Sequence, residues 1–132
     1  MLKKLFRTIN EIADPSLRFS HYLSVIKVCK IKPKVNEISK EFFVQAYQCS
    51  TIVIDPKEKF KMQFFLCIEA DTGILETRRI NPALQSMSDC ISKLSNLNKI
   101  KSYREMALIY RKFNHTEIAI KYESLASVLE KE

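Results

Sequence analysis

Histidine, cysteine and paired carboxylates are the side chains most often used for chemistry, and this chain carries them in arrangements that favour no reaction. Its two histidines, His21 and His115, lie near opposite ends of the sequence. Neither has a cysteine, an aspartate or a second histidine at the spacing that a metal ion or a general base requires. The sequence around His115 is typical of a turn. We therefore expect no catalytic or metal-binding histidine.

The cysteines are also poor candidates for chemistry. They are spread along the chain and form no Cys-x-x-Cys pair, so they do not match a zinc site. None stands at an expected helix start or close to a histidine, where a thiolate would be stabilised. We expect them to be small buried hydrophobic residues of a cytoplasmic protein in a reducing compartment. The four are Cys29, Cys49, Cys67 and Cys90.

Neither the carboxylates nor the glycine of this chain indicates an active site. Asp71 with Asp89, and Glu58 with Glu69, can be read as acidic pairs, but helical surfaces produce such pairs constantly. The only glycine is Gly73, whereas phosphate-binding loops need several glycines where the backbone meets phosphate. We expect no catalytic residue, no metal and no cofactor, and hence a protein that is not an enzyme.

The elements that position these residues are marked by a repeated motif. Asp14-Pro15…Phe19 and Asp55-Pro56…Phe60 both place an aromatic residue four positions after Asp-Pro, and they lie 41 residues apart. A weaker third copy is Asn98…Tyr103. A period of this size is typical of a chain built from stacked helix pairs. Such stacks usually provide binding surfaces.

Apolar residues recur at three- and four-residue steps in seven segments, which predicts seven helices and no sheet. We expect Asn81-Pro82 to open the fifth helix and Ser102 to cap the sixth, with Glu105 completing a capping box. The prediction is a single all-α domain with a starting helix at 1–14 and helix pairs at 15–55, 56–97 and 98–132. The expected helices are 2–13, 15–30, 35–54, 57–70, 82–96, 102–113 and 116–129.

The last helix pair carries aromatic and small residues at the spacing of a known repeat. Tyr103, Ala107 and Tyr110 are followed by two alanines in the second helix, Ala119 and Ala126. With these residues, 102–129 resemble a tetratricopeptide repeat, in which alanines let two helices approach closely. This resemblance implies stacked antiparallel helix pairs in a right-handed α–α superhelix.

The earlier pairs depart from that repeat. Leu23 and Phe64 stand where the last pair has Ala107, and the period is longer. Ile12-Ala13-Asp14-Pro15 and Ile54-Asp55-Pro56 are similar to a longer bacterial helical repeat with an I-x-D-P element. A lone starting helix followed by degenerate pairs also resembles small secretion chaperones of the tetratricopeptide type.

The resemblance implies a concave groove lined by the first helix of each pair. The groove would be apolar in its middle and basic at its C-terminal end, which suits a helical or acidic peptide. The alternative is that the apolar members are core residues and the basic ones are merely solvated. Our candidates for partner contacts are Lys61, Phe65, Ile68, Arg104, Leu108, Arg111 and Lys112.

The chain has 22 basic and 15 acidic residues, a formal net charge of +7. This surplus favours an acidic partner. The sequence therefore predicts a protein-interaction module, a chaperone or an adaptor that binds a protein or peptide. The alternative is a nucleic-acid-binding or regulatory protein that uses the basic surface, and a homo-oligomer stays open. No apolar run is long enough for a transmembrane helix.

The N-terminal segment leaves three alternatives. It carries Lys3, Lys4 and Arg7 on one side and apolar residues on the other. That pattern is typical of a helix at a membrane surface, but it equally suits a helix docked on the first pair. Self-association through this helix is the third alternative.

Overall fold

The computed structural model describes residues 2–29, 36–69 and 77–132, and side chains for 4–28, 40–69 and 80–132. Within these ranges every regular element is an α-helix, which confirms the predicted all-α chain of seven helices. The sequence also predicts a loop at Pro33, with lysines at 30, 32 and 34, and a helix end at Asp71-Thr72-Gly73. Both segments and the Cys29 side chain lie outside the described residues. The helices are α1 (Leu2–Asn10), α2 (Pro15–Cys29), α3 (Asn36–Ile52), α4 (Pro56–Glu69), α5 (Thr77–Ile91), α6 (Asn96–Lys112) and α7 (Thr116–Glu130).

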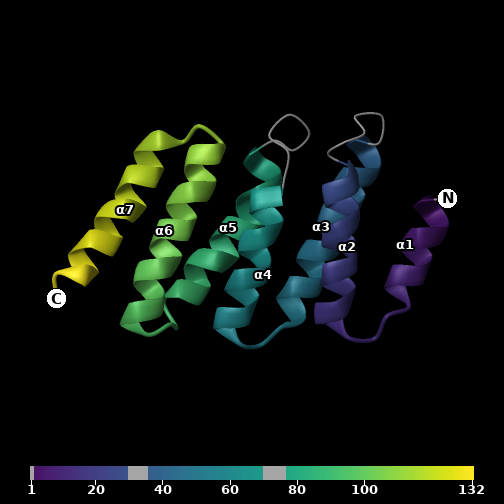
Figure 1. Cartoon of the computed structure of the whole chain (residues 1–132), viewed down its shortest axis with the longest axis horizontal. Helices are drawn as coiled ribbons and strands as arrows, with labels where there is room; N and C mark the ends of the chain where they lie inside the picture. The colour runs from purple at the N-terminus through teal and green to yellow at the C-terminus, as the bar shows by residue number, and fades with distance from the viewer. Residues whose placement is uncertain (1, 30–35, 70–76) are drawn as a thin grey trace.

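The helices stand in a row, with the two termini at opposite ends (Figure 1). The closest packing lies within three pairs, α2 with α3, α4 with α5 and α6 with α7. The first helix of each later pair also touches both helices of the pair before it: α4 contacts α2 and α3, and α6 contacts α4 and α5. The fold is therefore a stack of helix pairs, in which each pair covers the exposed face of its neighbour.

The pairs begin with equivalent N-terminal caps. The Asp14 carboxylate accepts a hydrogen bond from the Ser16 amide at 3.1 Å, and the Asp55 carboxylate accepts one from the Lys57 amide at 3.3 Å. These bonds satisfy amides that the first helical turn leaves without a partner. In the third pair Ser95 takes this place, since its hydroxyl accepts from the Asn98 amide.

The predicted cap at Ser102 is therefore wrong. Ser102 is buried within α6, more than one turn after the true helix start at Asn96. The caps at positions 14, 55 and 95 give steps of 41 and then 40 residues. The third copy thus begins before the Asn98 of the sequence prediction, and this shift changes which α6 residues correspond to those of α4.

The fifth helix also begins earlier than predicted. α5 starts at Thr77, and Pro82 lies inside the helix instead of opening it. The extra turn places Ile80 in the core, where it is 1% exposed. Burial of this side chain offsets the backbone hydrogen bond that a proline in a helix interior removes.

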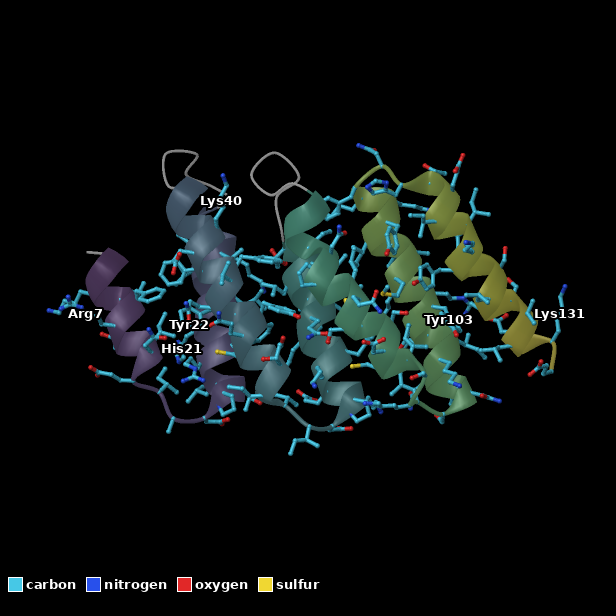
Figure 2. All side chains as sticks on the ribbon, turned by 180° about the vertical axis from the view of Figure 1, so that it is seen from behind. Arg7, His21, Tyr22, Lys40, Tyr103 and Lys131 are labelled. Atoms are coloured by element: carbon cyan, nitrogen blue, oxygen red, sulfur yellow. The ribbon has the colours of Figure 1, made fainter. Side chains whose placement is uncertain are left out.

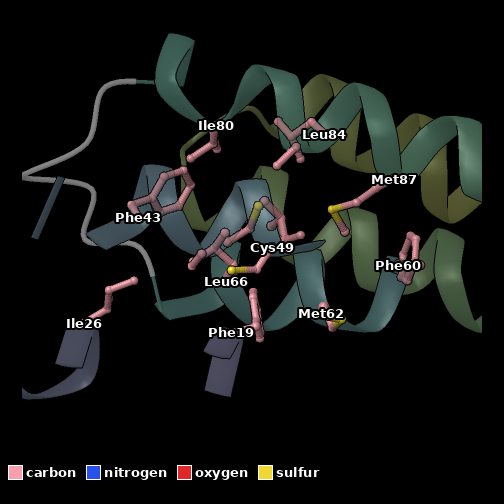
Figure 3. Close-up of a cluster of buried hydrophobic side chains, with 14 of the residues drawn as sticks. Phe19, Ile26, Phe43, Cys49, Phe60, Met62, Leu66, Ile80, Leu84 and Met87 are labelled. Carbon is pink, nitrogen blue, oxygen red and sulfur yellow. The ribbon is translucent and has the colours of Figure 1, made fainter. Parts of the chain in front are cut away.

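One continuous apolar core runs through the stack. Leu66 of α4 lies in a cluster with Phe19 of α2, Cys49 of α3 and Leu84 of α5 (Figure 3). Cys49, Cys67 and Cys90 are free thiols and all three are buried, as the sequence predicts. Because α4 and α6 are held from both sides by this core, the surface between them has a defined shape.

α1 is docked on the first pair. Phe6 packs against Tyr22 and Phe42 with ring centroids 5.9 and 5.5 Å apart, and the Tyr22 hydroxyl donates a hydrogen bond to the Asn10 side chain. Arg7 points away from the stack (Figure 2). The apolar face of α1 is thus used within the fold. Among the described helices, none combines the length and apolar character needed to cross a bilayer.

Candidate peptide-binding groove

A groove of about 160 Å³ lies between α4 and α6, the first helices of the second and third pairs. One wall comes from α4, the other from α6 and the turn before it. The floor is apolar where Phe60 is buried, and Phe65 keeps 44% of its surface exposed. The lining residues are Lys57, Phe60, Lys61, Phe65, Leu94, Asn98, Lys101, Ser102 and Glu105.

Three lysines give the groove its charge. Lys57 and Lys61 are four residues apart on α4 and so share one helix face. Lys101 extends from α6 across the groove. Lys61 and Lys101 are separated by 40 residues, the step between the caps of α4 and α6, so they occupy equivalent positions in successive pairs. None of the three forms an ion pair with another described residue.

Glu105 sets a limit on this positive charge. It lies on the same groove as Lys101, and burial raises the pKa of its carboxyl, while Lys101 lowers it in part. A partly desolvated carboxylate favours its neutral form. The groove therefore contains three cations and one acid that is more easily protonated than an exposed glutamate.

The structure brings only some of the seven predicted contact residues together. Lys61 and Phe65 line the groove. Ile68 is half-buried at the far end of α4, where its carbonyl accepts a hydrogen bond from the Lys112 ammonium of α6. Leu108 is 55% exposed on α6 but is not part of the groove lining. Lys112 therefore joins α6 to α4.

Arg104 and Arg111 face α7. Arg111 holds the carboxylate of Glu123 with two hydrogen bonds of 2.7 and 3.0 Å, and Arg104 forms an ion pair with Glu130. The Arg111–Glu123 contact raises the pKa of the guanidinium and lowers that of the carboxyl. These arginines connect the two helices of the last pair and lie apart from the groove.

The predicted and observed positions of these arginines differ because the sequence prediction used a different register between successive helix pairs. The sequence prediction aligned Arg104 with Lys61, which assumes a longer step between the last two pairs. With the 40-residue step, Arg104 corresponds to Phe64 and to Leu23 of the first pair, both of which pack against the core. Sequence reasoning thus missed Lys57, Asn98 and Glu105 as groove residues. The cap at Ser95 is the signal that corrects the register of the two α6 residues, Asn98 and Glu105.

The buried thiols differ in their surroundings: the Cys49 sulfur accepts a hydrogen bond of 3.1 Å from the Arg18 guanidinium, whereas Cys67 lies in the apolar core. Burial raises the pKa of the Cys67 thiol to about 12, so that it stays protonated at neutral pH. His115 lies edge-on to the Tyr110 ring, with centroids 6.3 Å apart. Among the described residues, no three histidine, cysteine or acidic side chains are placed to hold a metal ion.

No protein-family model, characterised protein or solved structure matches this chain. The side chains and their arrangement in the stack are therefore the basis for assigning a function.

Proposed function

We propose that this protein is a non-enzymatic interaction module, an adaptor or chaperone, that binds an acidic peptide in the groove between α4 and α6. The observation that carries the proposal is the meeting of Lys57, Lys61 and Lys101 around a half-exposed phenylalanine. Lysines attract and orient a carboxylate, while the apolar floor supplies area that a side chain can bury. A cytoplasmic setting is part of the proposal, and the free buried thiols support it.

The size of the groove defines the partner. Lys57 and Phe65 are eight residues apart, about 12 Å along a helix. That length matches about two turns of a bound helix. The volume of about 160 Å³ suits one large apolar side chain. The expected ligand is an amphipathic helix with one apolar anchor and carboxylates beside it.

The test uses a synthetic helical peptide with glutamates on one face and leucines on the other. Lys61→Glu with Lys101→Glu removes two of the three cations that contact the peptide. We expect binding to weaken by about 100-fold or more, because like charges now oppose each other across the groove. Isothermal titration calorimetry with the purified full chain measures this change.

Lys121→Glu with Lys131→Glu is the matched control, since both lysines are exposed on or beside α7 and the net charge changes equally. If both double variants lose affinity to the same extent, general charge and not the groove explains binding. Arg104 and Arg111 are unsuitable for reversal because each would then meet a carboxylate of α7.

A single-stranded oligonucleotide tests the nucleic-acid alternative. Base stacking needs free aromatic faces, and Tyr103 and Tyr110 already pack on Tyr122. We expect the oligonucleotide to bind more weakly than the acidic peptide at physiological salt. The reverse order, with a steep salt dependence, would show a phosphate-binding protein instead.

A further inference from the structure

A second pocket lies on the other side of α6. It is larger, about 530 Å³, and falls within the size range of ligand-binding clefts. α5 supplies most of its wall, and α6 and α7 each add one tyrosine. Its lining residues are Asn81, Pro82, Leu84, Gln85, Ser88, Tyr110 and Tyr122. Tyr110 and Lys101 are nine residues apart on α6, about half a turn around the helix axis, so the pocket and the groove face in opposite directions.

None of the described residues that line this pocket carries a charge. The polar groups Asn81, Gln85 and Ser88 recur at steps of four and three, which places them in one row along α5. The row is about 10 Å long, from the helical rise per residue.

The tyrosines form the opposite wall. Tyr110 and Tyr122 are stacked, with centroids 5.6 Å apart and ring planes 12° apart. Tyr103 packs on Tyr122 with the ring planes 37° apart, and His115 meets Tyr110 with the ring planes 79° apart. Both tyrosines of the stack contribute to the pocket lining. Neither hydroxyl forms a hydrogen bond with another described residue.

The polar row on α5 and the tyrosine wall together favour a particular class of ligand. The pocket presents two phenol donors, two amide side chains and one serine hydroxyl, which can donate to a carbonyl. The Gln85 amide nitrogen already donates to the Asp89 carboxylate at 3.2 Å, which leaves one of its two protons for a ligand. A polyproline II segment exposes its carbonyls, lacks amide donors at proline, and advances about 9 Å in three residues, close to the length of the polar row.

We propose that the pocket between α5 and the α6–α7 pair is a second peptide-binding site, specific for an uncharged, proline-rich segment in the polyproline II conformation. Such a segment is ordered before it binds, so little conformational entropy is lost, and an aromatic wall with hydrogen-bond donors is the usual way to hold it. With the basic groove on the opposite side of α6, the chain presents two separate surfaces of different chemistry.

The experiment titrates the ¹⁵N-labelled full chain with a synthetic decaproline peptide and follows the amide signals. We expect shifts in residues 81–88 and around Tyr110 and Tyr122, with none at Lys57 or Lys61. The double variant Tyr110→Phe with Tyr122→Phe keeps both rings and removes both hydroxyls. We expect it to bind decaproline at least about tenfold more weakly.

Gln85→Ala should weaken binding too, whereas Gln48→Ala, an exposed glutamine on α3, is the matched control and should not. The proposal is overturned if decaproline leaves the pocket signals unchanged, or if the phenylalanine variant binds as tightly as the native protein. It is also overturned if cellohexaose shifts the same signals at lower concentration than decaproline, since the site would then be a carbohydrate site. None of these results depends on the groove between α4 and α6.

Discussion

The groove and the pocket flank the same helix yet differ in every property that governs binding. The groove between α4 and α6 is narrow, basic and has an apolar floor. The pocket beside α5 is wider, and its described lining residues are uncharged, with hydroxyls and amides opposite stacked tyrosines. A repeat stack can therefore present different chemistry on its two sides, because the two helices of a pair contribute separately to each side.

The two surfaces are linked through α6, which borders both of them, and through the core below them. Cys67 of α4 is fully buried in this core. If the core is one cooperative unit, the groove and the pocket form together and are lost together. Three changes of decreasing expected effect test whether the groove and the pocket form one structural unit and yet bind their ligands independently.

Leu66→Ala is expected to have the largest effect. Leu66 is fully buried at the centre of the stack, where it packs with residues from neighbouring helices. Removing its side chain leaves a cavity, and we expect the free energy of unfolding to fall by about 2–5 kcal/mol. Urea denaturation followed by circular dichroism measures the change. Leu97→Ala, at a leucine that is 80% exposed, is the control and should alter stability little.

The same variant tests the comparison directly. Two of the five tyrosines, Tyr22 and Tyr47, lie in α2 and α3, so Leu66→Ala is combined with Tyr22→Phe and Tyr47→Phe to leave only the tyrosines of the α6–α7 pair. We expect the fluorescence of these three to follow the same transition as circular dichroism. Two separated transitions would mean that the pocket unfolds independently of the groove. The surfaces would then belong to two folding units of one stack, a known behaviour of repeat proteins.

Stability at alkaline pH tests whether the Cys67 thiol is shielded from water in the folded protein. Because burial raises the pKa of this thiol to about 12 from an ordinary value of 9.0, the unfolded chain releases its proton first as the pH rises. Stability attributable to the neutral thiol is therefore present below pH 9 and is lost between about 9 and 12. We expect the native protein to lose stability over this range faster than Cys67→Ala.

Parallel stability curves for the two proteins would show that Cys67 is accessible to water in the folded state. The lysines and tyrosines titrate in both proteins, so the difference between the curves isolates the thiol. If water reaches Cys67, the core between the groove and the pocket is less tightly packed than its burial indicates.

The sequence predicts the stack well because its signals are local. The Asp-Pro motifs at 14–15 and 55–56 mark two pair boundaries, and the structure places N-terminal caps at both aspartates. Apolar spacing identifies the helices, and the alanines at 119 and 126 are buried as a close helix crossing requires. These features depend on neighbours within one or two turns, which a sequence displays directly.

The groove is harder to predict because it depends on register between pairs. Ser102 is the predicted cap of the sixth helix, whereas the structure has Ser95 there, and this difference shifts the alignment of α6 on α4. The shift placed Arg104 in the groove and overlooked Glu105, although Lys61 and Phe65 were identified. The pocket could not be predicted, since it depends on how Pro82 and the tyrosines of two other helices meet in space.

Glu105→Gln is the change with the smallest expected effect, and it separates the two surfaces most sharply. Removing this charge leaves the three lysines of the groove unopposed, so we expect the acidic peptide to bind about two- to fivefold more tightly. Decaproline binding in the pocket should be unaltered. Glu117→Gln, at an exposed glutamate on α7, is the matched control.

Because burial raises the pKa of Glu105, the native protein takes up a proton there as the pH falls, and its affinity for the acidic peptide should converge with that of the variant. A variant that binds the acidic peptide no better than the native protein at neutral pH would mean that Glu105 does not face the bound peptide, and the groove between α4 and α6 would lose its assignment as the acidic-peptide site.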